Sequence, residues 1–490
     1  MLRNVVIIIT DQQRADMCAR RGFPVDTTPT CDSVASAGAW FRNAFTSMPL
    51  CSPARTSLLT GRFPSAHRVR ENYGLEGALF EDDLFSLAAR GGLRTGLFGK
   101  NHTYLDAGRV DCWREYSHDG AREARNQEER EFDQWLKGLH HRTALEPAPG
   151  GVSVQLPYRI VSDAIEWVEQ LVDDPFCMLL SFPEPHNPYQ VCEPYSSLWD
   201  LGDIPPAPGA ARESLGWLGE YLHEIGQGAF HDYDEVIPQA RRNYCGMLRL
   251  IDDQVGRFLS ALEQSGLRDS TLVVMCSDHG DYMGQYGLVR KGVGMSNCLV
   301  EIPLVFSGCG ISDEQGERSE CVSIVDVLPT ICEAFSWEIP QGVQGRSLWP
   351  LLRGGAEWKD EFRWGYAELG VGGLPYDRAS VPPERPGLDE ERVAAVGFDE
   401  LNAVTQGGRW RMVSDGRWKL VMDVLGNGRV YDLEDDPTET RGWTLGSQNH
   451  EVEAALLRAL SVWSLRVEDP LAVPANGYIR RRPLHNWVWA

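Results

Sequence analysis

Four apolar runs of this chain each end in polar residues, and this repeated arrangement constrains the fold more than any other feature of the sequence. The runs cover residues 5–9, 94–98, 176–182 and 271–276. The first is entirely β-branched, which is typical of a strand buried on both faces of a sheet. Apolar residues at helical spacing occur over residues 158–171, 247–262 and 322–335. Strands that alternate with helices predict an α/β fold, with a large, mostly parallel or mixed sheet flanked by helices and ligands beyond the carboxyl ends of the strands.

The character of the sequence changes after Leu351. A Pro/Gly-rich stretch is followed by short apolar runs over 410–413, 418–422 and 430–433, separated by turn residues. This pattern predicts an antiparallel meander. We therefore expect an N-terminal domain over 1–358, and a smaller C-terminal α+β domain over 359–490 that ends in a tail, 471–490. Residues 193–239, which contain several prolines and aromatic residues, are interpreted as an insertion or lid.

The charge balance limits the partners of this chain. Its 490 residues carry a formal net charge of −23, which repels nucleic acid and anionic membrane surfaces, so we expect neither as a partner. The apolar run 5–9 is too short for a membrane span or a signal peptide. The twelve cysteines lack paired C-x-x-C spacing, and most are interpreted as buried thiols of a cytoplasmic protein.

Two of the predicted strands end in an acidic residue followed by a second ligand-type side chain. Asp11-Gln12 follows the first strand, and Asp278-His279 follows the fourth. The strand ends of such a sheet meet at one edge, so the two pairs are expected to lie close together. Carboxylate and amide oxygens suit a hard divalent cation such as Ca²⁺. The alternative is that each aspartate caps the turn or helix that follows it.

Cys51 begins the segment Cys-Ser-Pro-Ala-Arg-Thr-Ser-Leu-Leu-Thr-Gly-Arg, residues 51–62. A bare Cys-x-Pro-x-Arg could be a free thiol in a loop, but the continuation to Leu-Thr-Gly-Arg resembles the sulfatase family of the alkaline-phosphatase superfamily. In that family a maturation enzyme recognises the segment and oxidises the cysteine to Cα-formylglycine. The resemblance implies an alkaline-phosphatase-like fold, a formylglycine at position 51 and such an enzyme as a partner.

Further segments resemble the same family, in the same order along the chain. They are the two acidic pairs, Gly99-Lys100-Asn101-His102, Pro185-His186, Arg290-Lys291-Gly292, the helix around Ile251-Asp252-Asp253, and the late Arg417-Trp418-Lys419 and Asp436-Pro437-Thr438-Glu439.

The resemblance implies a complete site for a sulfate ester. One Ca²⁺ would be held by Asp11, Gln12, Asp278, His279 and the modified Cys51, and the sulfate would be lined by Arg55, Lys100, His102, His186 and Lys291. The hydrated aldehyde, a gem-diol, would attack sulfur. Arg55 would hold the diol, His102 would assist its deprotonation, and His186 or Lys291 would protonate the leaving alkoxide. Asn72 would be a further substrate contact.

Three alternatives stay open at this point. The pairs Asp11-Gln12 and Asp278-His279 also occur in phosphonate monoester hydrolases, although Lys100 and His102 follow the sulfatase form, so sulfate is favoured over a phosphonate or phosphodiester. A choline-sulfatase-like activity is the second alternative, and a catalytically silent binding protein is the third. For the alcohol we expect a small carbohydrate.

The aromatic residues of the insertion (Trp199, Trp217, Tyr221) and of the basic tail 471–490 could shape a sugar subsite, a quaternary-ammonium cage or a subunit contact, or simply pack on the protein itself. The tail could also be an arm exchanged within a homo-oligomer.

Overall fold

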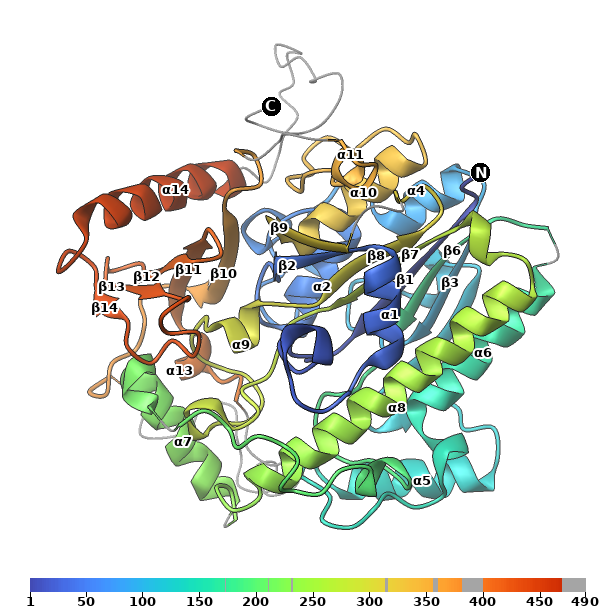
Figure 1. Cartoon of the computed structure of the whole chain (residues 1–490), viewed down its shortest axis with the longest axis horizontal. Coiled ribbons are helices and arrows are strands. Elements are labelled where there is room, and N and C mark those ends of the chain that lie inside the picture. The colour runs from blue at the N-terminus through green and yellow to red at the C-terminus, as the bar shows by residue number, and fades with distance from the viewer. Residues whose placement is uncertain are drawn as a thin grey trace.

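The computed structural model describes residues 1–171, 173–209, 211–230, 232–312, 316–355, 360–380 and 400–468. A nine-stranded sheet forms its centre, with the strand order β5-β4-β3-β6-β1-β7-β8-β2-β9 (Figure 1). The strands are β1 (Asn4–Thr10), β2 (Ala39–Phe45), β3 (Arg94–Gly99), β4 (Cys112–Ser117), β5 (Gly120–Ala121), β6 (Phe176–Ser181), β7 (Thr271–Ser277), β8 (Leu304–Gly308) and β9 (Gly316–Ser323).

The middle of the large sheet is parallel. β1 pairs in parallel with both β6 and β7, so that Ile9 lies beside Ser181 on one side and Cys276 on the other. β3 continues the parallel set beyond β6. The sheet becomes mixed because β8 runs antiparallel to β7 and β2. The carboxyl ends of β1, β3, β6 and β7 therefore lie at the same edge.

Alternate residues of β1 enter two separate cores. Val5, Ile7 and Ile9 pack on the face covered by α2, α4 and α10, whereas Val6 and Ile8 pack on the face covered by α6 and α8. The long helices α6 and α8 lie side by side along the sheet in Figure 1. The helices of this part are α1 (Pro29–Ala37), α2 (Cys51–Thr60), α3 (Pro64–His67), α4 (Leu84–Arg90), α5 (Gln127–Gly138), α6 (Leu156–Gln170), α7 (Trp217–Ala229), α8 (Ile237–Gln264), α9 (Asn297–Val300), α10 (Val327–Ala334) and α11 (Trp349–Leu352).

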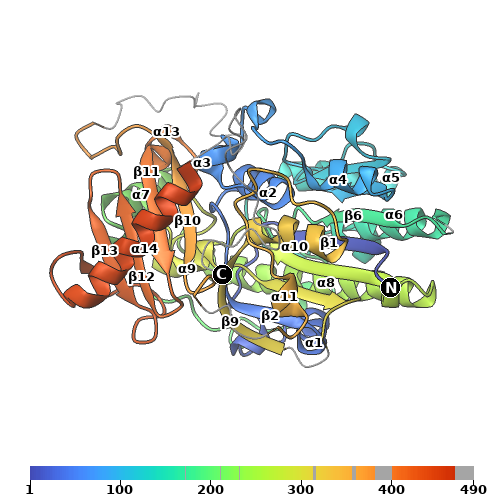
Figure 2. The same ribbon diagram turned by 90° about the horizontal axis from the view of Figure 1, so that it is seen from above.

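A second sheet of five antiparallel strands stands beside the first (Figure 2). Its strands are β10 (Gly365–Gly372), β11 (Gly408–Ser414), β12 (Trp418–Asp423), β13 (Gly428–Asp432) and β14 (Trp443–Thr444), and its helices are α13 (Ala403–Gln406) and α14 (His450–Glu468). α14 packs against β11 and β12. The predicted meander is therefore present, and the expected fold class is confirmed by both sheets.

The predicted helix over 322–335 is wrong at its start. Val322 and Ser323 belong to β9, where they pair with Ala44 and Phe45 of β2, and α10 begins at Val327. Ser323 and Asp326 form a capping box at this point, which ends the strand and starts the helical turn.

The interpreted insertion, 193–239, is well packed. It contains α7, whose Leu222 is fully buried, and its last residues belong to α8. The predicted tail, 471–490, lies outside the described residues, and the proposed domain boundary at 358 stays a prediction. All twelve cysteines are free, and nine of them are buried. In the parts of the chain described here, no helix has both the length and the apolar character needed to cross a membrane.

Candidate active site

The ends of β1 and β7 bring the two acidic pairs into contact. Thr10 lies beside Ser277 in the parallel register, so Asp11 and Asp278 follow at the same level. The backbone N–H of Gln12 donates to Asp278 Oδ1 at 3.0 Å, and the N–H of Asp278 donates to the carbonyl of Thr10 at 3.2 Å. Both carboxylates are fully buried. They are therefore held rigidly at the carboxyl edge of the sheet.

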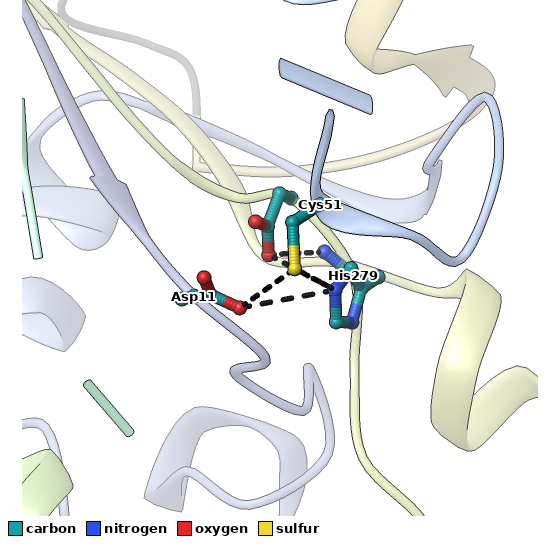
Figure 3. A group of neighbouring side chains, drawn as sticks. Asp11, Cys51 and His279 are labelled. Carbon is teal, nitrogen blue, oxygen red and sulfur yellow. Dashed lines mark hydrogen bonds and ion pairs between the residues drawn. The ribbon is translucent and has the colours of Figure 1, made fainter. Parts of the chain in front are cut away.

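Cys51 is the first residue of α2 and points into this pair of aspartates (Figure 3). Its Sγ lies 3.5 Å from Asp11 Oδ1 and 3.3 Å from His279 Nε2. One ligand atom from each of Asp11, Cys51, Asp278 and His279 lies within 4.8 Å of the others. These four side chains form a compact, buried group, called here the Cys51 cluster.

The donors of the Cys51 cluster fit a divalent cation. Two buried carboxylates and an imidazole converge there, and such a concentration of negative charge is costly in a buried site unless cations balance it. His279 Nδ1 lies 2.8 Å from the carbonyl of Gly280, to which it can donate, and this leaves Nε2 directed at the cluster. Gln12 lies beside the cluster. Its Oε1 accepts a hydrogen bond from Lys291 Nζ at 2.8 Å, and its Nε2 donates to Asp281.

Three buried cations surround the cluster: Arg55, Lys100 and Lys291. Arg55 lies one helical turn after Cys51, and its Nε donates to Asp278 Oδ2 at 2.8 Å. Lys100, directly after β3, contacts Asp11 Oδ2. Burial is the largest influence on Asp11 and would raise its pKa, but Lys100 together with His186 and Arg55 lowers that pKa well below its ordinary value. Asp11 is therefore ionised, and the site carries fixed charges of both signs.

His102 lies close to Cys51 but has no hydrogen bond at Nδ1. That atom is buried and makes no hydrogen bond in the described part of the chain. Arg55 Nη2 makes none either, although it lies 3.6 Å from Asp11 Oδ2. Burial and the charge of Lys100 lower the pKa of His102, although Cys51 opposes this shift. Two buried polar atoms that lack hydrogen bonds at one site indicate that a ligand completes their hydrogen bonding.

Three histidines cluster beside Lys100. The rings of His118 and His186 are stacked with their centroids 3.9 Å apart, and His141 meets both edge-on. His118 Nε2 lies 2.8 Å from Lys100 Nζ, so the imidazole accepts from the ammonium. His186 Nδ1 lies 2.6 Å from the carbonyl of Asn187. The donation of Nδ1 to that carbonyl leaves Nε2 available to a substrate.

Asn72 lies next to the nucleophile position rather than in the cluster itself. Its Oδ1 accepts the backbone N–H of Ser52 at 3.1 Å, which satisfies one donor at the start of α2. Asn72 also lines a cavity of about 840 Å³ together with Leu50, Tyr73 and Leu374. Asn72 therefore connects the start of α2 with this cavity.

Sequence reasoning missed three residues of this site: His118, His141 and Asp281. His118 lies in the turn between β4 and β5, and His141 lies in a loop, so neither follows one of the four predicted strands. Asp281 stands two residues after His279, beyond the second acidic pair. Its carboxylate accepts from Tyr189 Oη at 2.7 Å and from Gln12, so it orients the Gln12 amide. Its position three residues after Asp278 is the sequence feature from which a place in this site could have been predicted.

The fold and the site together define a class. A mixed sheet covered by helices, with Cys51 at a helix start and a buried group of potential metal ligands at its carboxyl edge, is the arrangement of an alkaline-phosphatase-like enzyme.

The chain belongs to the sulfatase family, whose family model, described as Sulfatase, matches residues 3–336. It is therefore an enzyme of the sulfuric ester hydrolase class, as the motifs predicted. A multifunctional alkaline phosphatase superfamily protein, PehA, of Trinickia caryophylli is 29% identical over 74% of this chain and 80% of its own. An arylsulfatase of Clostridium perfringens is 28% identical over 74% of this chain and 80% of its own. The crystal structure of a phosphonate monoester hydrolase of Agrobacterium radiobacter is similar with a TM-score of 0.74 and 25% identity, covering 98% of this chain and all of that one.

Proposed function

We propose that this protein hydrolyses the sulfate monoester of a small carbohydrate, with Cys51 converted to formylglycine and with Ca²⁺ held by Asp11, Gln12, Asp278 and His279. The observation that carries the proposal is the position of Cys51 Sγ, which lies within 3.5 Å of both Asp11 and His279 at the start of α2. A nucleophile at this atom would face a substrate held by Lys100 and Lys291.

The surrounding cations would offset the negative charge of the ester, which otherwise repels an attacking nucleophile. A sulfate monoester is an anion, and the whole chain carries a formal charge of −23. Arg55, Lys100 and Lys291 are each at most 4% exposed, so their charge is little screened by water and acts directly on the bound ester. When present, the hydrated aldehyde supplies the attacking hydroxyl, and the cation supplies positive charge that favours its ionised form.

Each remaining side chain has a role that its position supports. Arg55 Nη2 makes no hydrogen bond in the described residues, although it lies 3.6 Å from Asp11 Oδ2, and it would hold a hydroxyl on residue 51. His102 Nδ1 likewise makes no hydrogen bond there and would accept a proton from that residue. Lys291 Nζ would donate a proton to the leaving alkoxide, a role typically worth about 10²–10⁴-fold in rate. His186 would take this role only with Nε2 protonated as well, because Nδ1 already donates to the Asn187 carbonyl and burial lowers the pKa of the ring well below its ordinary value.

The cavity beside Asn72 supports a carbohydrate as the alcohol. It is large enough for a sugar unit, at about 840 Å³, and polar groups line it at Asn72 and Asn402. Tyr73 and Leu374 are each 69% exposed at its wall, which is an unusual degree of exposure for large apolar side chains. They offer flat apolar surface next to hydrogen-bonding groups, as the face and the hydroxyls of a sugar require.

A second candidate is hydrolysis of a phosphonate monoester. The Asp-Gln and Asp-His pairs and the likeness to the Agrobacterium enzyme favour it. Both esters place an anionic, tetrahedral group in the same cationic pocket, so geometry alone favours neither.

One preparation tests both candidates. The tryptic peptide of residues 43–55 is weighed after expression with a maturation enzyme, and the same sample is given 4-nitrophenyl sulfate and phenyl 4-nitrophenylphosphonate. We expect the aldehyde mass and calcium-dependent sulfate release that exceeds phosphonate turnover. Faster phosphonate turnover would select the second candidate. No turnover of either ester by a sample that carries the aldehyde would refute the proposed reaction.

A further inference from the structure

A groove lined by arginines lies next to the cavity beside Asn72, which is called here the sugar cavity. The groove measures about 830 Å³ and lies between α3, the strands β11 and β12, and α14. Four arginines line it: Arg68, Arg70, Arg409 and Arg411. Arg409 and Arg411 are alternate residues of β11 and therefore point to the same face of the small sheet. We call this feature the arginine groove.

The arginines of the groove are incompletely paired. Arg411 donates to Ser65 Oγ at 3.0 Å and lies 3.8 Å from the buried carboxylate of Glu368. Arg70 reaches only a backbone carbonyl, that of Val371, at 3.5 Å. The guanidinium groups of Arg68 and Arg409 make no hydrogen bond or ion pair with any residue of the described ranges. In a protein with a net charge of −23, unpaired clustered arginines need an explanation.

Apart from Glu368, which pairs with Arg411, no carboxylate of the described residues forms an ion pair with these arginines. Asp423 lines the groove, but its two oxygens accept from the N–H groups of Leu425 and Asn427 and from the Asn427 amide, all at 2.9 Å. Glu468 stands at the far end of α14. The pKa of Arg70 is lowered, mainly by burial and then by its neighbour Arg409, which agrees with a local excess of positive charge.

The groove and the active site are joined by one short segment. Arg68, Arg70 and Asn72 occur at every second position, so Arg68 lies at most about 14 Å along the chain from Asn72. Asn72 holds the N–H of Ser52 beside Cys51, and Val371, which accepts from Arg70, lines the sugar cavity. A molecule that starts at Cys51 and passes through the sugar cavity therefore reaches the groove next.

We propose that the arginine groove binds a second anionic group, a sulfate or a carboxylate, on the same oligosaccharide whose sulfate ester is hydrolysed at Cys51. The inference rests on the proposed function, because it takes the bound substrate to begin at that residue. The planar guanidinium fork matches the paired oxygens of such groups. The substrate is then an acidic oligosaccharide, and the arginines determine which sugars bind well.

The test separates binding from turnover. Full-length protein carrying Cys51→Ala is titrated by calorimetry with a sulfated chondroitin tetrasaccharide, with the desulfated form, and with neutral chitotetraose. The variant pair Arg68→Gln with Arg409→Gln is compared with the pair Arg114→Gln with Arg353→Gln, which removes the same charge from exposed positions outside the groove. A lower Kd for the sulfated tetrasaccharide would identify sulfate as the preferred group, and a lower Kd for the desulfated form would identify carboxylate.

We expect the groove pair to raise the Kd of the preferred anionic tetrasaccharide at least tenfold, and the control pair to raise it less than twofold. The difference should shrink as salt is raised from 50 to 500 mM. With Cys51 intact, neither pair should change kcat/KM for 4-nitrophenyl sulfate more than twofold. Equal losses in the two pairs, an equal loss of chitotetraose binding, or no tetrasaccharide binding in the wild-type groove would each overturn the inference. Failure of the proposed function would appear separately, as absence of aryl sulfate turnover.

Discussion

The Cys51 cluster and the arginine groove both gather positive charge, but they hold it in opposite ways. In the cluster, Arg55 and Lys100 are buried, and each contacts a buried aspartate. In the groove, Arg68 is exposed and has no partner among the described residues. Buried, paired charges are fixed before a substrate arrives and suit catalysis. Exposed, unpaired charges adapt to what they meet and suit recognition, so the two regions should respond differently to mutation.

Removal of the proposed nucleophile should have the largest effect. We expect Cys51→Ala to lower kcat/KM for 4-nitrophenyl sulfate at least about 10⁴-fold, because loss of a covalent nucleophile leaves only binding and electrostatic contributions. Steady-state assays measure this change. Cys112→Ala, at the edge of the large sheet, is the matched control and should keep full activity. Substantial residual activity in Cys51→Ala would show that the Cys51 cluster does not supply the nucleophile, and would contradict its assignment to catalysis.

The small sheet should contribute to stability rather than to the chemical step. Trp463 of α14 is 1% exposed and stacks on Tyr366 of β10, with ring centroids 5.4 Å apart. Trp463→Ala should lower the free energy of unfolding by about 3–5 kcal/mol, as measured by urea titration. Activity per folded molecule should stay within about twofold. Leu465→Ala, whose parent side chain is 73% exposed, should change stability by less than about 0.5 kcal/mol. A large loss of kcat in folded Trp463→Ala would contradict this division.

His67 links the two regions and should make stability depend on pH. It is fully buried in α3, its Nε2 lies 3.0 Å from Ser57 Oγ of α2, and burial lowers its pKa to about 3. The folded protein therefore resists protonation of this ring, whereas the unfolded chain takes up a proton below about pH 6.5. The contribution of His67 to the free energy of unfolding should be fully present above pH 6.5 and should fall as the pH drops below that value.

The His67 contribution can be isolated by substitution. Between pH 7 and pH 5, protonation of His67 in the unfolded chain should lower the free energy of unfolding by about 2 kcal/mol, as measured by urea titration at each pH. His67→Gln removes one titrating group and should make the curve less steep by that amount over this range, whatever its stability at pH 7. The remaining slope belongs to other buried histidines whose pKa is also lowered, among them His118 and His186. Parallel curves for the two proteins would show that His67 does not titrate in this way.

His118 should have the smallest effect on the reaction, because it acts through Lys100. His118→Ala should lower kcat about tenfold, since the ammonium loses the acceptor that orients it at 2.8 Å. His118→Gln keeps an acceptor oxygen and should recover most of that loss. If both variants lose kcat equally, the stack on His186 rather than the hydrogen bond to Lys100 is what matters.

The parts of the fold and site that follow from local sequence could be predicted. Asp11, Lys100 and Asp278 stand directly after apolar strands, so the parallel register that aligns the strands also brings these residues together. His118 could not be found in this way, because a two-stranded turn at the sheet edge brings it over Lys100. The start of α10 was misplaced for a similar reason: pairing of Val322 with Ala44 overrides the helical spacing of the sequence.

The burial of α2 determines when Cys51 can be modified. All ten of its residues are buried, and Cys51 is 1% exposed. An enzyme that modifies a side chain has to enclose the chain around it, and the folded protein leaves no room for that. The proposed conversion of Cys51 therefore has to be complete before the segment folds, and any molecule that folds first keeps its thiol and stays inactive for its lifetime.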